Sequence, residues 1–242
     1  MNNKRQALVT GANKGIGLAI AKGLAEAGFF VWIGARDRSR GEQAVAQLRN
    51  IGLDADLLDL DVAVEDSVYR AAAILSEQIG ALDILINNAG IAVDMTKAPS
   101  EVRMQDMKAV YEVNLFGPVR VTQAFLPLLK KADQARIVMV SSGVGSLTLI
   151  TDPTSIYSTV NLLDYTSSKV ALNAVMVSFA KELESLGIKV NAVEPGHVRT
   201  DLNGNSGILT PEEGAATVIK MALLGLDGPT GGFFGSHGRQ PW

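Results

Sequence analysis

Short apolar runs alternate with amphipathic segments from one end of the chain to the other. LDILI (82–86) and ARIVMV (135–140) are almost continuously apolar, as expected of strands that are buried on both faces. Segments 16–27 and 65–79 have the spaced apolar positions that are typical of helices. Strands that alternate with helices of this length predict right-handed strand–helix–strand units and a parallel sheet covered on both faces.

The same pattern predicts the order of elements along the chain. Strands are expected at 6–11, 29–35, 55–62, 82–90, 135–142 and 189–196, with 231–235 as a candidate seventh. Helices are expected at 16–27, about 39–51, 65–79, roughly 101–131 and from about Tyr165 onward. Because no linker, repeat or low-complexity segment interrupts this order, residues 1–242 are expected to form one α/β domain with a doubly wound, Rossmann-type parallel sheet.

Composition narrows the class of protein. The chain has 242 residues, of which 47% are hydrophobic and 19% charged, enough for one sizeable core. Its net charge of −3 comes from interspersed charges, without a basic tail or acidic block, so neither nucleic acid nor a membrane is expected as a partner. With no cysteine and two distant histidines, no metal site is expected. No signal peptide or membrane span is recognised, which favours a cytoplasmic protein.

A glycine-rich turn, TGANKGIG, lies between the first strand and the first helix. Gly11 permits the sharp turn, while Gly15 and Gly17 let the backbone approach a phosphate and let the helix pack on the strand. The exposed N–H groups of a helix N-terminus then favour an anion. The spacing GxxxGxG differs from the GxGxxG fingerprint, and glycines of this kind also serve as simple turn formers. Their position in the first strand–helix unit favours dinucleotide binding.

Charged residues near this turn bear on the choice of dinucleotide. NAD-preferring sites usually have an acidic residue after the second strand, where it holds the ribose hydroxyls. Here the strand ends in GARDR, with Arg36 first, and Lys14 lies within the glycine turn. Two cations near the ribose would neutralise a 2′-phosphate, which favours NADPH over NADH. Asp37 is the dissenting residue, because turned inward it favours NAD. The less favoured alternative is that Lys14 and Arg36 are solvated surface charges.

Further motifs give the chain a resemblance to a known family. These are NNAG (87–90), the serine pair Ser141–Ser142, YTSSK (165–169) and PGHVRT (195–200), which follow the glycine turn. Together they make the whole chain similar to short-chain dehydrogenases/reductases, especially to the NADPH-dependent carbonyl reductase branch. The resemblance implies a catalytic tetrad of Asn114, Ser142, Tyr165 and Lys169. It implies cofactor contacts from Gly11, Asn13, Lys14, Gly15, Ile16, Gly17, Arg36, Asp61, Val62, Asn88, Ala89, Gly90, Tyr165, Lys169, Pro195, Gly196, Val198 and Thr200.

The spacing within YTSSK suits proton transfer. A free tyrosine has a pKa near ~10, and a lysine four residues later lies on the same helix face, where its charge would lower that value. Tyr165 would then be the general acid in reduction and the general base in oxidation. Ser142 would donate to the substrate carbonyl, and Asn114 would position a water. Taken one at a time, these residues also have structural explanations. The YxxxK spacing can arise by chance, Ser142 can form a turn at a strand end, and Asn114 can bond to the backbone of a helix.

The segment between the serine pair and Tyr165 is longer than in many relatives. Residues 143–164 are therefore expected to be an insertion that forms a wall or lid of the substrate pocket. Tyr157 lies in it, and we expect it to be a packing or pocket-lining aromatic. Residues 204–213 are a second candidate wall, or an ordinary connector. An insertion at this place would obstruct the helix face that many relatives use for dimerisation, so monomer and homo-oligomer both stay open.

The sequence therefore predicts NADPH-dependent reduction of aldehydes or ketones, reversible in principle. Two alternatives stay open: a 3-oxoacyl thioester reductase, and a dinucleotide-binding regulator without turnover. The intact set of Asn114, Ser142, Tyr165 and Lys169 argues against the regulator. The carbonyl substrate and the stereochemical preference depend on loops whose shape cannot be derived from the sequence.

Overall fold

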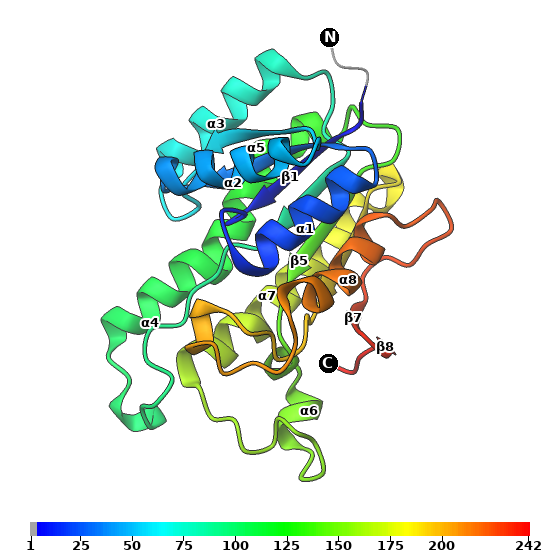
Figure 1. Cartoon of the computed structure of the whole chain (residues 1–242). Helices are drawn as coiled ribbons and strands as arrows, with labels where there is room; N and C mark the ends of the chain where they lie inside the picture. The colour runs from blue at the N-terminus through cyan, green and yellow to red at the C-terminus, as the bar shows by residue number, and fades with distance from the viewer. Residues whose placement is uncertain (1–3) are drawn as a thin grey trace.

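An eight-stranded sheet forms the centre of the computed structural model, which describes residues 4–242 (Figure 1). Its strand order is β3-β2-β1-β4-β5-β6-β7-β8. All neighbouring strands are parallel except β7 and β8. The strands are β1 (Gln6–Thr10), β2 (Phe30–Ala35), β3 (Ala55–Asp59), β4 (Ile84–Asn87), β5 (Arg136–Val140), β6 (Lys189–Val193), β7 (Phe233–Gly235) and β8 (Gly238–Arg239).

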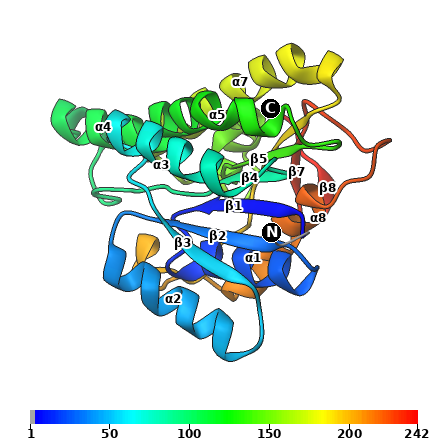
Figure 2. The same ribbon diagram turned by 90° about the horizontal axis from the view of Figure 1, so that it is seen from above.

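Helices cover both faces of the sheet, as the view from above shows (Figure 2). One face carries α1 (Gly15–Glu26), α2 (Arg38–Asn50) and α8 (Pro211–Ala222). The other carries α3 (Glu65–Gln78), α5 (Gly117–Leu129) and α7 (Leu163–Leu183), with α4 (Met104–Tyr111) packed against α7. The short α6 (Leu147–Thr151) lies within the segment after β5. Single turns are η1 (Pro99–Glu101), the π-helical η2 (Glu112–Phe116), η3 (Gly143–Gly145), η4 (Glu184–Leu186) and η5 (Asp201–Asn203).

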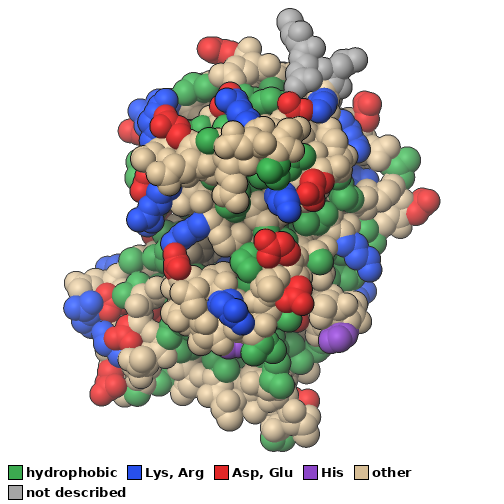
Figure 3. Space-filling view, in the orientation of Figure 1, with side chains coloured by type: hydrophobic (Ala, Val, Ile, Leu, Met, Phe, Trp, Pro, Cys, Tyr) green, Lys and Arg blue, Asp and Glu red, His purple; other side chains and the backbone are tan. Residues whose placement is uncertain are grey.

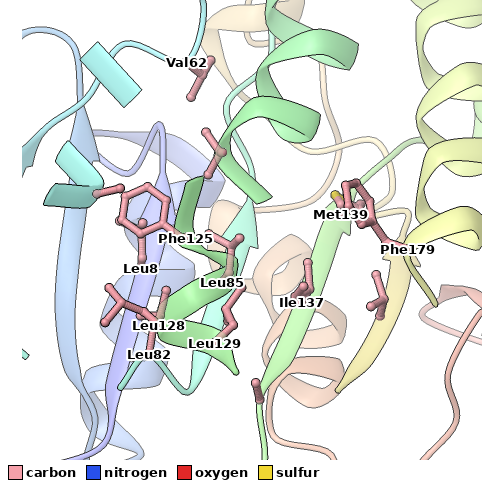
Figure 4. Packing of buried hydrophobic residues seen from close by; sticks show 14 of the residues in the cluster. Leu8, Val62, Leu82, Leu85, Phe125, Leu128, Leu129, Ile137, Met139 and Phe179 are labelled. Atoms are coloured by element: carbon pink, nitrogen blue, oxygen red, sulfur yellow. The ribbon is translucent and has the colours of Figure 1, made fainter. Parts of the chain in front are cut away.

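Two apolar clusters, one on each face, hold these layers together. The cluster under α3, α5 and α7 includes Phe125 and Leu8, which are fully buried, and Figure 4 shows Phe125 among leucines of β1, β4 and α5. The opposite cluster joins α1, α2 and α8 to the sheet through residues such as Ile20 and Val218. Because both faces are covered, the central strands have to be apolar on both sides, which explains their continuous runs.

The predicted doubly wound α/β fold is confirmed, and most element boundaries agree with the expected ones within a few residues. The expected helix over 101–131 is instead two helices, α4 and α5, joined by the π-helical turn η2. Helix α8 was not predicted, although Thr210 and Glu213 form a capping box ahead of it and Pro211 occupies its first turn. The antiparallel β8 was also not predicted; a tight turn after β7 suffices to form it.

The strand order places β1 between β2 and β4, so successive connections leave β1 toward opposite sides. At such a switch point a crevice opens beyond the carboxyl ends of the strands, and ligands of doubly wound folds bind there. The glycine turn follows β1 and NNAG includes the end of β4, so both motifs lie at this crevice. The fold therefore brings the sequence motifs to one edge of the sheet.

The surface and the remaining helices add two observations. Positive and negative side chains are interspersed over the face seen in Figure 3. Within residues 4–242, no helix is long and apolar enough to cross a membrane. In the same part of the chain, no three His, Asp or Glu side chains gather in a way that could hold a metal ion.

Candidate active site

The glycine turn is packed directly against NNAG. A Cβ atom built on Gly17 would lie 2.5 Å from the Nδ2 atom of Asn88 and 2.5 Å from the carbonyl oxygen of Gly11. A Cβ atom on Gly11, whose φ is +64°, would lie 2.9 Å from the Cα atom of Ala89. Both approaches are too close for any side chain, so these two positions require glycine. Gly11, Gly17, Asn88 and Ala89 thus form one packed unit at the switch point.

Thr10, at the end of β1, fastens this unit by hydrogen bonds. Its Oγ1 atom accepts from the backbone N–H groups of Asn88 and Ala89, each at 3.0 Å. In return, the Asn88 side chain donates to the carbonyl oxygen of Thr10 at 2.9 Å. The Asn88 side chain therefore links the carboxyl ends of β1 and β4. The sequence analysis did not single out Thr10, since a hydroxyl at a strand end carries no distinctive signal.

The N-terminus of α1 is arranged to receive an anion. Lys14 is its N-cap residue, and no side chain caps the helix, so its first N–H groups remain available as donors. Ile16 packs on the apolar cluster beneath, while Asn13 is half-buried in the turn. Gly15 faces Thr200 across the crevice; a Cβ built on it would lie 3.6 Å from the Thr200 Cγ2 atom. This opening fits the pyrophosphate of a dinucleotide.

Lys14 also links the turn to the far wall of the crevice. Its ammonium group forms an ion pair with Asp201, although both side chains are more than half exposed. The hydrogen bond and charge of Lys14 hold the pKa of the Asp201 carboxyl below its usual value. Lys14 is therefore not simply a solvated cation: it already joins residues that lie far apart in sequence.

The end of β2 gives Arg36 and Asp37 different surroundings. Asp37 is the N-cap of α2: its Oδ1 accepts from the backbone N–H of Arg40 at 3.0 Å. Its Oδ2 lies 3.3 Å from the Arg40 Nε. Arg36 is exposed, and within residues 4–242 no acidic side chain pairs with it. The Asp37 carboxylate is thus engaged in capping and pairing, whereas the Arg36 side chain is exposed.

The segment after β3 is also ordered by local bonds. The Oδ1 atom of Asp61 accepts from the N–H of Ala63 at 3.0 Å. Val62 is buried, its carbonyl oxygen accepts from Arg120 at 2.6 Å, and its side chain packs on Gly117 of α5. These contacts fix the backbone of Asp61 and Val62 at the same edge of the sheet as the glycine turn.

Asn114 lies in the π-helical turn η2 between α4 and α5 and is fully buried. Its side-chain amide pairs with the backbone of Ile91, the residue after NNAG. The Oδ1 atom accepts from the Ile91 N–H at 2.8 Å, and Nδ2 donates to the Ile91 carbonyl at 2.9 Å. Nδ2 also lies 3.1 Å from the Oγ of Ser168 on α7. Insertion of such a turn in a helix often marks a functional site. Asn114 thus ties β4, α5 and α7 together.

Tyr165 and Lys169 lie one turn apart on α7. The Lys169 Nζ is 5.6 Å from the centre of the Tyr165 ring and donates to the carbonyl oxygen of Val140 at 2.9 Å. A Cβ built on Gly90 would lie 3.6 Å from this Nζ and 3.5 Å from the Asn114 Oδ1. Two members of the predicted tetrad, Asn114 and Lys169, therefore meet at Gly90, and Tyr165 lies beside Lys169.

Ser142, the fourth member, follows β5 and reaches Tyr165. Burial raises the pKa of Tyr165 to about 12, and the Ser142 hydroxyl acts in the opposite direction. Burial lowers the pKa of Lys169 to about 8. The expected lowering of the tyrosine pKa by Lys169 is thus not seen for the protein alone; withdrawal of the phenol from water outweighs it.

Residues of PGHVRT form the far wall of the crevice, after β6. Gly196 has a φ of +82°, and Pro195 and Thr200 are half-buried. The Val198 side chain is buried and packs on Gly214 of α8, so it supports the wall from behind. Residues 204–213 fold back on this wall: the Arg199 N–H donates to the Leu209 carbonyl at 2.8 Å. The last three of them already belong to α8.

A cleft of about 510 Å³ opens between the loop after β4 and the end of the 143–164 segment. Its lining residues are Met95, Thr96, Lys97, Ala98, Pro99, Thr159, Val160, Asn161 and Leu162. Leu162 is the N-cap of α7, which carries Tyr165 in its first turn. The cleft therefore ends three residues before Tyr165 in the chain, and its lining residues do not include the predicted tetrad.

Comparisons with known proteins agree with this geometry. A family model described as short chain dehydrogenase matches residues 5–208. The chain belongs to this family. The short-chain dehydrogenase anuI of Penicillium roqueforti is 39% identical over 226 residues, covering 90% of this chain and 88% of that protein. Carbonyl reductase (NADPH) 1 of Rattus norvegicus is 32% identical over 98% of both chains.

Solved structures of short-chain dehydrogenases have the same fold. The NADPH-bound carbonyl reductase from chicken fatty liver superposes with a TM-score of 0.86 at 30% identity and covers 99% of both chains. Salutaridine reductase from Papaver somniferum superposes with a TM-score of 0.81 at 30% identity, covering 96% of this chain and all of that one. The predicted family is therefore confirmed, and the relatives include carbonyl reductases.

Proposed function

We propose that this short-chain dehydrogenase reduces aldehydes or ketones to alcohols with NADPH. The observation that carries the proposal is the meeting of Asn114 and Lys169 at Gly90, with Tyr165 beside Lys169 and Ser142 beside the Tyr165 phenol. NADPH, when bound, would supply the hydride, and the chain would supply binding, orientation and a proton. Relatives described as NADPH-dependent carbonyl reductases support the same assignment.

The glycine turn and Arg36 would hold the cofactor. Free N–H groups at the start of α1 fit the pyrophosphate, and the exposed Arg36 fits the 2′-phosphate that distinguishes NADPH from NADH. The capping bond of Asp37 to α2 supports this choice, because it engages the carboxylate that would otherwise favour NAD. NADPH is therefore the preferred dinucleotide in this proposal.

The proton would come from the Tyr165 hydroxyl. Since its pKa lies near 12, the phenol is fully protonated at neutral pH and acts as the general acid in the reduction. The Ser142 hydroxyl would donate to the substrate oxygen as charge develops on it. Lys169, which is nearly fully buried, would hold its charge close to the phenol and favour the tyrosinate left after transfer.

The cleft that ends at Leu162, next to the start of α7, would take the rest of the substrate. Residues of the 143–164 insertion form one side of it and the loop after β4 forms the other. A volume of about 510 Å³ is in the range of ordinary small-molecule sites. We therefore assign the insertion as a wall of the substrate pocket.

The test is NADPH and NADH oxidation by the purified protein with aliphatic, aromatic and dicarbonyl substrates. We expect turnover with NADPH that is faster than with NADH. The variant Tyr165→Phe should lose at least about a hundredfold in kcat while still binding NADPH, whereas Tyr69→Phe, an exposed tyrosine on α3, should leave kcat unchanged. Binding of NADPH without turnover of any carbonyl compound would support a regulator instead, and turnover of 3-oxoacyl thioesters alone would narrow the substrate class.

A further inference from the structure

A second tyrosine, Tyr157, lies in the insertion and forms a hydrogen bond with the carboxylate of Glu194, outside the insertion. Its hydroxyl donates to the Oε2 atom of Glu194 at 2.9 Å. Tyr157 belongs to the insertion, while Glu194 directly follows β6 and precedes PGHVRT. The bond therefore connects the insertion with the sheet over a long sequence separation.

The Tyr157 ring also rests on the peptide that follows Ser142. A Cβ atom built on Gly143 would lie 2.1 Å from the Tyr157 Cζ, 2.4 Å from its Cε2 and 2.5 Å from its hydroxyl oxygen. The phenol thus fills the space that a side chain at position 143 would need. Any displacement of Tyr157 changes the packing of the residue next to Ser142.

The turn after Ser142 is held from its other side by α7. The Nδ2 atom of Asn173 donates to the carbonyl oxygen of Gly145 at 3.0 Å, and Asn173 is 3% exposed. A Cβ atom on Gly145 would lie 2.9 Å from the Ser141 hydroxyl. The turn η3 is therefore clamped between Tyr157 and α7, the helix that carries Tyr165.

Glu194 is placed to serve as a fixed acceptor. Within residues 4–242, no Lys, Arg or His forms an ion pair with it, and Tyr157 is the one side chain that donates to it. Its Oε1 lies against Gly235 of β7 on the other side. A hydrogen bond to an ionised acceptor is stronger than one between neutral groups. Burial and the Glu194 charge raise the pKa of Tyr157, so the phenol stays a donor at neutral pH and above.

We propose that Tyr157 and Glu194 are positioning residues that fix the Ser142 turn against Tyr165, so that the serine hydroxyl points at the reacting carbonyl. The inference rests on the proposed reductase function and deepens it. The Ser142 side chain makes no capping hydrogen bond to its own turn, although its carbonyl accepts from the Gly145 N–H at 2.8 Å. The direction of the hydroxyl therefore depends on the packing around the turn. A small misplacement of such a group weakens transition-state binding more than ground-state binding, so kcat falls while substrate KM changes little.

The experiment compares Tyr157→Phe, Glu194→Ala and Glu194→Gln with the wild-type protein, and uses Tyr69→Phe as the control. Tyr157→Phe keeps the ring over Gly143 and removes only the hydroxyl. We expect Tyr157→Phe and Glu194→Ala each to lower kcat about tenfold, with the dissociation constant of NADPH unchanged. Glu194→Gln keeps an acceptor oxygen and should restore kcat to within about threefold of the wild type.

Two further results separate positioning from general damage. The double variant Tyr157→Phe/Glu194→Ala should be no slower than the slower single variant, because both changes break the same contact. Hydrogen–deuterium exchange of amides 142–146, measured without added cofactor, should rise in Tyr157→Phe and Glu194→Ala and stay unchanged in Tyr69→Phe.

Several outcomes overturn the proposal. The proposal is wrong if Tyr157→Phe and Glu194→Ala both keep the wild-type kcat. It is also wrong if the losses of kcat in the two single variants add up in the double variant. If the wild-type protein turns over no carbonyl compound, the proposed function fails, and hydrogen–deuterium exchange alone tests the positioning of the Ser142 turn. Unchanged exchange of amides 142–146 in Tyr157→Phe and Glu194→Ala would overturn the positioning role. Raised exchange confined to those amides would support it.

Discussion

The Nζ of Lys169 lies 5.6 Å from the centre of the Tyr165 ring, and burial moves the pKa values of the two groups in opposite directions. The pKa of Tyr165 rises to about 12, and the pKa of Lys169 falls to about 8. Each group is thus shifted toward its neutral form, as withdrawal from water requires. The Tyr165 hydroxyl therefore keeps its proton over the whole physiological pH range. Lys169 is the member of the pair whose pKa lies close to that range.

This relationship predicts the pH dependence of stability. Lys169 has a folded pKa of about 8 against 10.5 for a free lysine, so between these values the unfolded chain binds more protons and stability rises with pH. The penalty for burying the charge is complete below pH 8 and disappears above about pH 10.5. Relative to Lys169→Met, the wild-type protein should therefore gain about 2 kcal/mol in unfolding free energy between pH 7.5 and 9.5.

Urea denaturation of both proteins at the two pH values measures this difference. The bond from Lys169 to Val140 is lost in Lys169→Met at every pH, so the pH dependence of the difference isolates the charge. A constant difference between pH 7.5 and 9.5 would contradict the lowered pKa of Lys169.

The contact of Gly17 with Asn88 predicts a selective effect of adding one methyl group. Gly17→Ala would force apart the glycine turn and NNAG, and should destabilise the protein by about 2–3 kcal/mol. NADPH binding should weaken with it, because the same turn presents the helix N-terminus. Gly80→Ala is the matched control, since a Cβ there meets nothing within 4 Å. Denaturation and NADPH titration of both variants give the comparison; equal effects at the two sites would refute it.

The different roles of Arg36 and Asp37 predict separable losses. Arg36→Ala should raise the KM for NADPH about tenfold or more and leave that for NADH nearly unchanged, because it removes a partner of the 2′-phosphate. Asp37→Ala should instead lower the unfolding free energy by about 1 kcal/mol, since it removes the cap of α2. Asp37→Asn keeps the capping oxygen and should retain most of that stability. A loss of NADH turnover in Asp37→Asn would instead identify Asp37 as a ribose ligand.

The cleft lined by the insertion predicts a change of substrate size. Val160→Trp should narrow it and raise the KM of bulky ketones about tenfold, while the KM of a small aldehyde stays the same. Ile156→Trp is the control, because Ile156 belongs to the same insertion, is 81% exposed and does not line the cleft. Equal KM changes for small and bulky substrates would show that the insertion is not a pocket wall.

The doubly wound fold could be predicted because its signals are local. Apolar runs such as 82–86 and 135–140 are strands buried on both faces, and the glycine turn follows the first of the strands. Helix α8 was missed although its capping box is visible in TPEE, because the preceding Gly and Asn residues were interpreted as a loop. The π-helical turn around Asn114 has no periodic signature of its own and continues a helical pattern.

The composition of the site was predictable to a lesser degree. The resemblance to the family implies Asn114, Ser142, Tyr165 and Lys169, and these roles stay predictions. No motif specifies that Asp37 caps α2. Likewise, the bond between Tyr157 and Glu194 joins segments whose proximity only the sheet creates. The pKa of Tyr165 depends on its burial in the folded protein, which the YTSSK motif does not specify. Long-range packing therefore decides what the motifs leave open.

The pairing of β1 with β4 bears on how the protein can be divided. Ala7 lies beside Ile84 in the sheet, and Gly11 and Gly17 pack on Asn88 and Ala89. A fragment that ends after β3 would contain the whole glycine turn and still lack the surface that shapes it. The nucleotide-binding half is consequently not a transplantable module, and a nascent chain completes it only after NNAG has left the ribosome.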